Sequence, residues 1–377
     1  MDENKVTILG GGHGAQTVAA DLSLKGFSVT LCDLPQFANS EVFQNTMKTR
    51  KIEVSGVIQG VANIDTVTTH IGDALKDARV IFVIARSNAD ELFAKACAPC
   101  VEDGQTIVLG AGNCGSLVFA NTFKENKVKK DVLLAESASL PFGCRIRSPI
   151  PGEGTTNARV LFRTKDFVVG TFPAKRTDEV IAHLKRFYSE TKPAHNIIEA
   201  GLSNPNPIVH CTPTILNIGR IERVDSEKLG DFALFHEGFS ESVIRAVIEV
   251  RKERENILAK FGWQSGYKTP ADTSNFLYNV FKNCIPKEGV EEAWKTKGPM
   301  GPISEARYIT EDIPYGLVTY SSFGKLIGVE TPTIDAVIQL SSVMNQKNYM
   351  QEGRTITRLG IGGMGVKKLN QFLYEGY

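Results

Sequence analysis

Residues 5–33 read KVTILGGGHGAQTVAADLSLKGFSVTLCD, and this stretch decides the fold. Residues 5–9 form an apolar, β-rich run of the kind found in buried parallel strands. A glycine cluster follows, and after it residues 15–25 have the apolar periodicity of a helix. Residues 27–32 predict a second strand, which ends at Asp33. The stretch therefore predicts one βαβ unit.

The same alternation continues along the first half of the chain. Further strands are predicted over residues 80–84, 105–109 and 132–136, with helices over residues 88–100 and from residue 117 to residue 123. Two β-rich runs (159–162 and 167–172) and a helix (178–187) complete this half. Repeated β-then-α units predict an α/β Rossmann domain, built on a doubly wound and mostly parallel sheet.

From about residue 203 the periodicity becomes helical. Proline residues separate five predicted helices, over residues 237–261, 271–282, 315–326, 333–344 and 366–374. A chain of 377 residues is long enough for two domains. We therefore expect a Rossmann domain over residues 1–195 and a mostly α-helical C-terminal domain over residues 196–377.

The glycine cluster has the spacing of a dinucleotide-binding loop. Gly10, Gly12 and Ala15 match G-x-G-x-x-A, where the small residues allow a tight turn, close approach of backbone N–H groups to a pyrophosphate, and close helix–strand packing. His13 and Gly14 complete the loop, and we expect His13 to lie near the pyrophosphate. The alternative, a structural glycine turn, is disfavoured because the motif follows a strand and opens a helix.

Two further positions complete the predicted cofactor site. Asp33 ends the next strand, where it would accept hydrogen bonds from the adenosine ribose and repel a 2′-phosphate, so NAD is favoured over NADP. The alternative is an exposed turn aspartate before Pro35. Gly110 and Asn113 follow a later strand on the expected nicotinamide side, although an ordinary β-to-α turn explains them equally well.

Composition excludes several other classes of protein. The formal net charge of +1, without a long basic run, argues against nucleic acid and anionic membranes as partners. No apolar run reaches the roughly 20 residues of a membrane span, and the acidic start of the chain does not resemble a signal peptide, so we expect a cytoplasmic protein. The seven cysteines are scattered and predict no metal site. Cys97 and Cys100 have CxxC spacing. A redox role and simple apolar packing are the two alternative explanations of this spacing.

Two segments of the second half carry candidate catalytic residues. Residues 203–213 place His210 among three prolines, and histidine is the usual proton carrier near neutral pH. Residues 305–317 group Arg307 with several carboxylates and tyrosines before a helix. Taken singly, a hydrogen-bonded core histidine and a helix start capped by a carboxylate are the alternatives.

Together these segments resemble the opine dehydrogenase family, which includes the octopine and nopaline dehydrogenases. The family has N-P-x-x-H and R-Y-x-x-E-D-x-P-x-x-L segments, found here at residues 206–210 and 307–317. Residues 238–243, 328–333 and 353–364 extend the resemblance over nearly the whole chain. The resemblance implies NAD(P)H-dependent condensation of an amino acid with a 2-oxo acid, and reduction of the resulting imine to an opine.

The resemblance also implies a catalytic triad of His210, Asp312 and Arg307. His210 would give a proton to the reacting centre and take it back in the reverse direction, and Asp312 would orient the ring. Arg307 would hold a substrate carboxylate or buttress Asp312. Two alternatives remain. One is a 2-oxo acid or 3-hydroxy acid reductase, although such enzymes commonly use a catalytic lysine. The other is a non-catalytic NAD(H)-binding module. A homodimer is also open.

Overall fold

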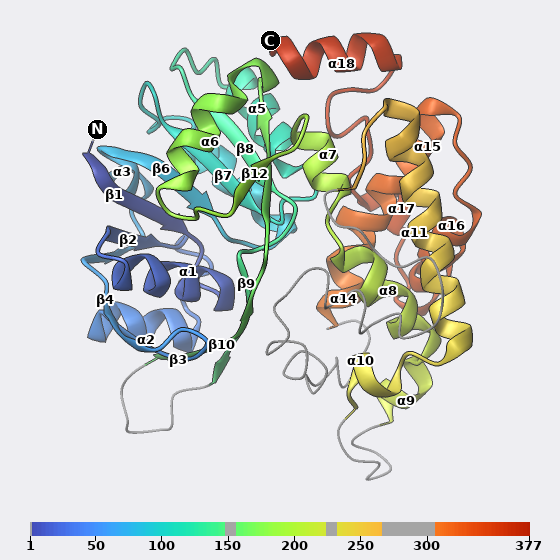
Figure 1. Cartoon of the computed structure of the whole chain (residues 1–377), viewed down its shortest axis with the longest axis horizontal. Coiled ribbons are helices and arrows are strands. Elements are labelled where there is room, and N and C mark those ends of the chain that lie inside the picture. The colour runs from blue at the N-terminus through green and yellow to red at the C-terminus, as the bar shows by residue number, and fades with distance from the viewer. Residues whose placement is uncertain (1, 148–155, 224–231, 266–305) are drawn as a thin grey trace.

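The N-terminal half of the chain forms an eight-stranded sheet (Figure 1). The computed structural model describes residues 2–147, 156–223, 232–265 and 306–377. Across the sheet the strands are β12 (Thr191–Pro193), β11 (Phe167–Phe172), β8 (Leu133–Ser137), β7 (Thr106–Gly110), β6 (Ala78–Val83), β1 (Asp2–Leu9), β2 (Ser28–Cys32) and β5 (Thr66–Thr68). Neighbouring strands are parallel except for β8 and β11. From β5 to β8 the order is that of a Rossmann fold, which confirms the predicted class.

A second, four-stranded sheet was not predicted. It contains β4 (Gly60–Asn63), β3 (Lys51–Gly56), β10 (Thr156–Arg163) and β9 (Phe142–Arg147), in that order. The β-rich run at residues 159–162 lies in β10, which pairs with β3 and β9 and not with the large sheet. Every second residue of β10 is buried over its first half, a pattern that is typical of a strand with one covered face.

Helices cover both faces of the large sheet. On one face, α1 (His13–Leu24) and α6 (Thr177–Lys185) pack on Val6, Val29 and Val80. On the other face, α4 (Asp90–Cys97) and α5 (Gly115–Glu125) pack on Ile81 and Ile107. The sheet and these helices form the doubly wound domain expected from the alternating pattern.

The second half of the chain is helical. Its described elements are α7 (Ile197–Leu202), α8 (Asn206–Leu216), α9 (Ile218–Glu222), α10 (Leu234–Glu237), α11 (Glu241–Phe261), α14 (Arg307–Thr310), the π-helical turn η3 (Ile313–Leu317), α15 (Val318–Ile327), α16 (Pro332–Met344), α17 (Tyr349–Glu352) and α18 (Val366–Glu375). The predicted helix over residues 271–282 lies outside the described residues.

Capping residues explain where the longest helix begins and ends. The sequence pattern predicted a start at residue 237, but α11 begins at Glu241 because the Ser240 side chain accepts a hydrogen bond from the Val243 backbone N–H. Gly262 ends the helix in the left-handed conformation, with φ of 82°. The predicted helix over residues 315–326 is divided into η3 and α15.

The two halves share one apolar core. Phe119 of α5, Leu202 of α7 and Val247 of α11 belong to the same buried cluster. At the end of the chain α18 returns to the N-terminal half near α5 (Figure 1), where the Phe372 and Phe172 ring centroids lie 5.2 Å apart. The boundary at residues 195/196 stays a prediction, since α7 just beyond it still packs on β8 and β11.

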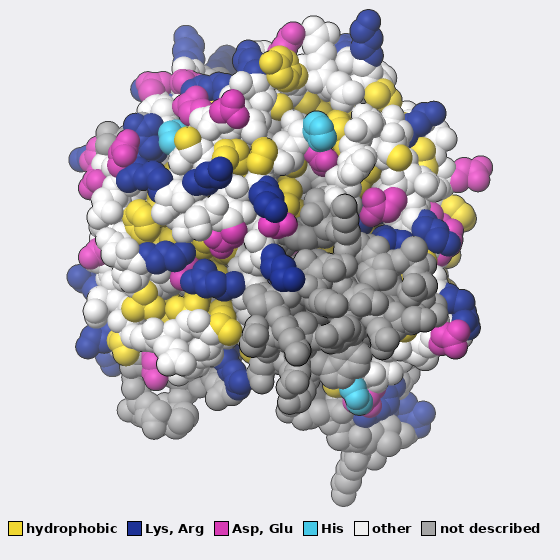
Figure 2. All heavy atoms as spheres, viewed as in Figure 1, with side chains coloured by type: hydrophobic (Ala, Val, Ile, Leu, Met, Phe, Trp, Pro, Cys, Tyr) yellow, Lys and Arg dark blue, Asp and Glu magenta, His cyan; other side chains and the backbone are white. Residues whose placement is uncertain are grey.

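The surface agrees with the nearly neutral composition. On the face drawn in Figure 2, basic and acidic side chains are interspersed. In the part of the chain that the structure describes, no helix combines the length and apolar character needed to span a bilayer. Cys97 is fully buried, and burial raises the pKa of its thiol, so packing explains this residue.

Gly10 supplies a test of the turn that starts the fold. Its φ is +116°, and a Cβ there would lie 2.3 Å from the Ile84 carbonyl oxygen. We expect Gly10→Ala to lower the free energy of unfolding by about 3 kcal/mol or more, because the left-handed backbone and the clash add together. Denaturant unfolding without NADH measures this change.

Gly12→Ala is the matched control for that variant. Gly12 has a φ of −79°, and a Cβ there would meet nothing within 4 Å. The expected change is within about 1 kcal/mol, the difference between glycine and alanine as N-caps. Equal destabilisation of the two variants would contradict the role assigned to Gly10.

Candidate functional site

Three loops meet at the carboxyl edge of the large sheet. The register pairs Leu9 with Val83 and Val83 with Leu109, so β1, β6 and β7 end side by side. The glycine loop follows β1, residues 85–89 follow β6, and residues 111–114 follow β7. In doubly wound sheets ligands bind at this edge, where the strand order reverses.

The geometry of the glycine loop fits a pyrophosphate. Gly12 precedes α1, and no atom lies within 4 Å of the place that a Cβ would take, so the backbone of Gly12 is exposed to solvent. At Gly14 a Cβ would lie 2.9 Å from atoms of both Ile84 and Leu140, and Ala15 is fully buried. The loop is therefore tight toward the protein and open at the N-terminus of α1, where an anion is favoured.

Asp33 lies at the end of β2, where the adenosine ribose was expected. It is largely buried, and its Oδ1 accepts a hydrogen bond of 2.8 Å from the Leu34 backbone N–H. Burial raises the pKa of Asp33 to about 6, while backbone N–H groups of Leu34 and Gly11 oppose the shift. The carboxylate lies under the glycine loop, since a Cβ on Gly11 would come within 2.6 Å of its Oδ2.

His210 and Asp312 form a direct buried pair in the helical half. His210 lies on α8, and its Nδ1 is 2.8 Å from Oδ2 of Asp312, just before η3. The Tyr308 ring stacks on the imidazole, with centroids 3.8 Å apart and planes within 12°. Because an ionised carboxylate only accepts hydrogen bonds, Nδ1 carries the proton and Nε2 of the neutral ring is left as an acceptor.

The surroundings favour the neutral form of this histidine. Burial lowers the pKa of His210, and the positive charges of Arg307 and Arg145 lower it further. Asp312 acts in the opposite direction and raises this pKa, through its hydrogen bond and its charge. The ring is therefore neutral at pH 7 and is poised to accept a proton at Nε2.

Arg307 is the third predicted catalytic residue, and it pairs with Glu311. Its Nε lies 3.0 Å from Oε2 of Glu311, one turn along the chain, and half of its side chain is exposed. Glu311 also accepts a hydrogen bond of 3.0 Å from the Ser87 backbone N–H, in the loop after β6. This carboxylate thus joins α14 to the Rossmann domain.

Three arginines surround the glycine loop. Burial lowers the pKa of His13, and the charges of Arg145, Arg307 and Arg86 lower it further. These arginines come from β9, α14 and the loop after β6, and all three are exposed. The region around the glycine loop is therefore positively charged and suits phosphate and carboxylate groups. Arg86 and Arg145 were not among the residues predicted from the sequence, because only the fold places them near this loop.

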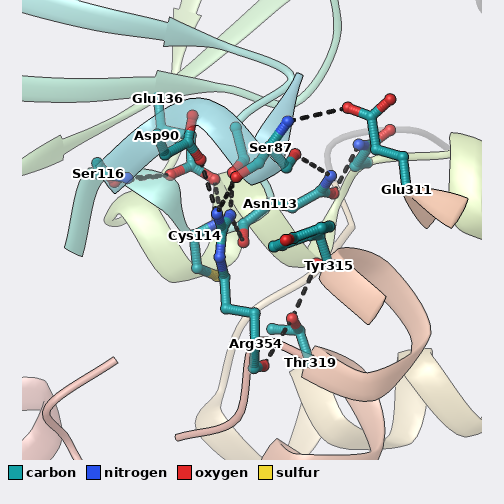
Figure 3. Close-up of polar contacts among 12 residues, drawn as sticks. Ser87, Asp90, Asn113, Cys114, Ser116, Glu136, Glu311, Tyr315, Thr319 and Arg354 are labelled. Carbon is teal, nitrogen blue, oxygen red and sulfur yellow. Dashed lines mark hydrogen bonds and ion pairs between the residues drawn. The ribbon is translucent and has the colours of Figure 1, made fainter. Parts of the chain in front are cut away.

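Gly110 and Asn113 lie on the expected side of the sheet, but their neighbours are other residues of the protein. A Cβ on Gly110 would lie 2.5 Å from Ile84, so its small size serves packing. The Asn113 side chain is buried (Figure 3): it accepts a hydrogen bond of 2.7 Å from Asn204 Nδ2 and donates one of 3.3 Å to Ser87 Oγ. Their contacts with a cofactor stay predictions.

The described residues contain no group of His, Cys, Asp and Glu side chains that could hold a metal ion. The site consists of a glycine loop, a histidine–carboxylate pair and exposed arginines. Such a set suits a dinucleotide and an anionic substrate between two domains.

Known proteins resemble this chain over its whole length. Residues 193–345 match the family described as NAD/NADP octopine/nopaline dehydrogenase, alpha-helical domain. An opine dehydrogenase of Arthrobacter sp. (strain 1C) is 30% identical over 374 residues, covering 97% of each chain.

Solved structures have the same fold. A structure of octopine dehydrogenase with NADH and pyruvate aligns with a TM-score of 0.69 and 18% identity, covering 99% of this chain and 98% of that one. A yersinopine dehydrogenase with NADP+ aligns with a TM-score of 0.66 and 13% identity, covering 99% of both chains. With this fold and the sequence identity to the Arthrobacter protein, the chain belongs to the opine dehydrogenase family.

Proposed function

We propose that this chain is an NAD-dependent opine dehydrogenase that joins the amine of an amino acid to a 2-oxo acid and reduces the resulting imine, or runs the reverse oxidation. The observation that carries the proposal is the His210–Asp312 pair, with a bond of 2.8 Å, in which the histidine is acted on by the same arginines, Arg307 and Arg145, that act on His13 of the glycine loop. Solved octopine dehydrogenase structures with pyruvate and with L-arginine support this pairing of substrates.

We assign the cofactor to the carboxyl edge of the sheet. Gly10, Gly12, His13, Gly14 and Ala15 would hold the pyrophosphate, and Asp33 would accept hydrogen bonds from the adenosine ribose. When bound, NADH supplies the hydride that reduces the carbon of the C=N bond. The charge of Asp33 disfavours a 2′-phosphate, which is why we propose NAD over NADP.

His210, Asp312 and Arg307 have separate roles in this proposal. Condensation releases water and forms the C=N bond, and its reduction requires one proton at nitrogen, which protonated His210 gives from Nε2. In the oxidation direction neutral His210 takes that proton back. Asp312 holds the ring in one tautomer and stabilises its charged form. Arg307, with Arg86 and Arg145, attracts the substrate carboxylates.

The proposal requires an amine for fast turnover. We expect little NADH oxidation with pyruvate alone, and at least about a hundredfold faster oxidation when a matching amino acid is added, because the imine is the group that the site reduces. A panel of amino acids and 2-oxo acids, with mass spectrometry of the products, tests this. Rapid reduction of a 2-oxo acid without any amine would instead indicate a hydroxy acid dehydrogenase.

Removing the imidazole separates catalysis from cofactor binding. His210→Ala is expected to lower kcat by a factor of about 10² to 10⁴, the range for a lost general acid–base, with an unchanged Kd for NADH. Gly12→Ala should show the opposite pattern, a weaker Kd for NADH, since its methyl group enters the space left for the pyrophosphate. Fluorescence titration with NADH and steady-state kinetics distinguish the two variants. A parallel loss of NADH affinity in His210→Ala would mean that His210 is structural.

The pH dependence of oxidation reports on His210. The neutral ring is needed to accept a proton, and the pKa of His210 is lowered from 6.5, so kcat/KM for oxidation should fall only below pH 6.5. Asp312 raises this pKa, so Asp312→Asn should move the acid limb to still lower pH. Rate profiles of both proteins from pH 4.5 to pH 9 on the opine product are the measurement. A limb that stays in place or moves to higher pH would exclude His210 as the titrating group.

A further inference from the structure

We propose that Arg354 is a positioning residue, which reaches from the C-terminal domain into the Rossmann domain and fixes the two loops beside the nicotinamide end of the cofactor site. These loops are residues 85–89 after β6 and residues 111–114 after β7. The inference rests on the proposed function for the meaning of these loops. Arg354 itself is only 4% exposed and is assigned no contact with substrate.

The guanidinium group of Arg354 binds both loops at once (Figure 3). Its Nη1 donates to the carbonyl oxygens of Gly112 at 2.8 Å and Asn113 at 2.9 Å. Its Nη2 donates to the Ser87 carbonyl oxygen at 2.9 Å and to Oδ2 of Asp90 at 2.7 Å. Only the planar fork of arginine can direct several N–H groups at acceptors on two separate loops.

The loop after β7 needs such support. Ala111, Asn113 and Cys114 have positive φ values of 54°, 49° and 65°, a conformation that non-glycine residues rarely adopt. Each such residue has a strained backbone, which persists only where its surroundings hold it. Arg354 holds the carbonyl groups of this loop, while buried Glu136 accepts hydrogen bonds from the N–H groups of Cys114 and Ser116.

The backbone of Arg354 is tied to the turn that carries Asp312. Its N–H donates to the Pro314 carbonyl oxygen at 2.8 Å, and its own carbonyl oxygen accepts from Thr319 Oγ1 at 3.0 Å. Pro314 follows Asp312 by two residues. One residue therefore connects the carboxylate that orients His210 to the loops that face the cofactor.

The backbone N–H and carbonyl group of Ser87 both form hydrogen bonds with the helical domain. Glu311 accepts from its N–H, and Arg354 donates to its carbonyl oxygen. The position of this loop is thus set by the domain that carries His210. Loss of either contact would weaken the connection between this loop and the catalytic helices.

Arg354→Lys is the first test, because it keeps the charge and removes the fork. We expect the Kd for NADH to rise by about tenfold, the scale of one lost charge-assisted hydrogen bond, and kcat to fall by a similar factor. Amide hydrogen exchange in the protein without NADH should become faster in residues 85–92 and 110–117. Arg358→Lys is the matched control, since Arg358 is exposed on the same segment, and it should change none of these values.

Chemical rescue tests the same point independently. In Arg354→Ala, guanidinium chloride at millimolar concentration should restore part of the NADH affinity and slow the exchange of both segments, whereas sodium chloride should not. If the alanine variant does not fold, the lysine variant carries the test alone.

Two outcomes would overturn the inference. One is unchanged exchange of both segments in Arg354→Lys, and the other is unchanged NADH affinity. Failure of this inference can be distinguished from failure of the proposed function. If the wild-type protein binds NADH but needs no amine, hydrogen exchange and NADH affinity can still be measured in the Arg354 variants.

Discussion

A guanidinium group buried between two domains needs oxygen atoms around it that accept its hydrogen bonds. This requirement determines how the two domains are arranged. An unpaired charge in the interior would cost several kcal/mol. Arg354 is therefore surrounded by carbonyl groups of two strand-end loops and by the carboxylate of Asp90. Burial raises the pKa of Asp90 to about 7, and the positive charge of Arg354 opposes this shift. The pair satisfies its hydrogen bonds only when the domains are held in one arrangement.

The same arrangement brings the catalytic pair to the cofactor edge. Asn204 precedes α8 and donates to Asn113, while its own carbonyl oxygen accepts from the Tyr320 hydroxyl at 2.8 Å. Its Oδ1 accepts from the N–H of Asn206, the first residue of the helix that carries His210. Hydrogen bonds thus run from the loop after β7 to the start of α8. A polar boundary of this kind specifies relative position more strictly than apolar packing does.

Local patterns explain which structural features could be predicted from the sequence. The glycine loop between β1 and α1, the place of Asp33 after β2 and the end of α11 at Gly262 each depend on residues that are close in the chain, so their signals are readable without a structure. Arg307 lies four residues before Glu311 on one helical turn, which brings the two together. The resemblance implied a substrate carboxylate or Asp312 as the partner of Arg307, whereas its ion pair in the structure is with Glu311.

Contacts between distant segments could not be predicted in this way. Arg354 and Gly112 are 242 residues apart, and only the folded chain brings them together. Arg145 lies near the glycine loop because β9 belongs to a second sheet. The pairing of that sheet depends on the register between strands that are far apart in the chain. The C-terminal segment that contains Arg354 did resemble the family. The hydrogen-bond partners of Arg354, however, lie in two loops that matter because they stand at the edge of the sheet, which the sequence does not reveal.

Charge links substrate binding to proton transfer in the proposed reaction. Burial keeps the His210 ring neutral, and Arg307 and Arg145 lower its pKa further while no anion lies near them. An opine and its precursors carry carboxylates, and a carboxylate placed between these arginines and the ring would offset their effect. The pKa of His210 would then rise, which favours the imidazolium that reduction requires. In the opposite direction, departure of the anionic product would lower the pKa again. Burial and the two arginines thus oppose Asp312 at one ring, and a bound anion would weaken the part of this opposition that comes from the arginines.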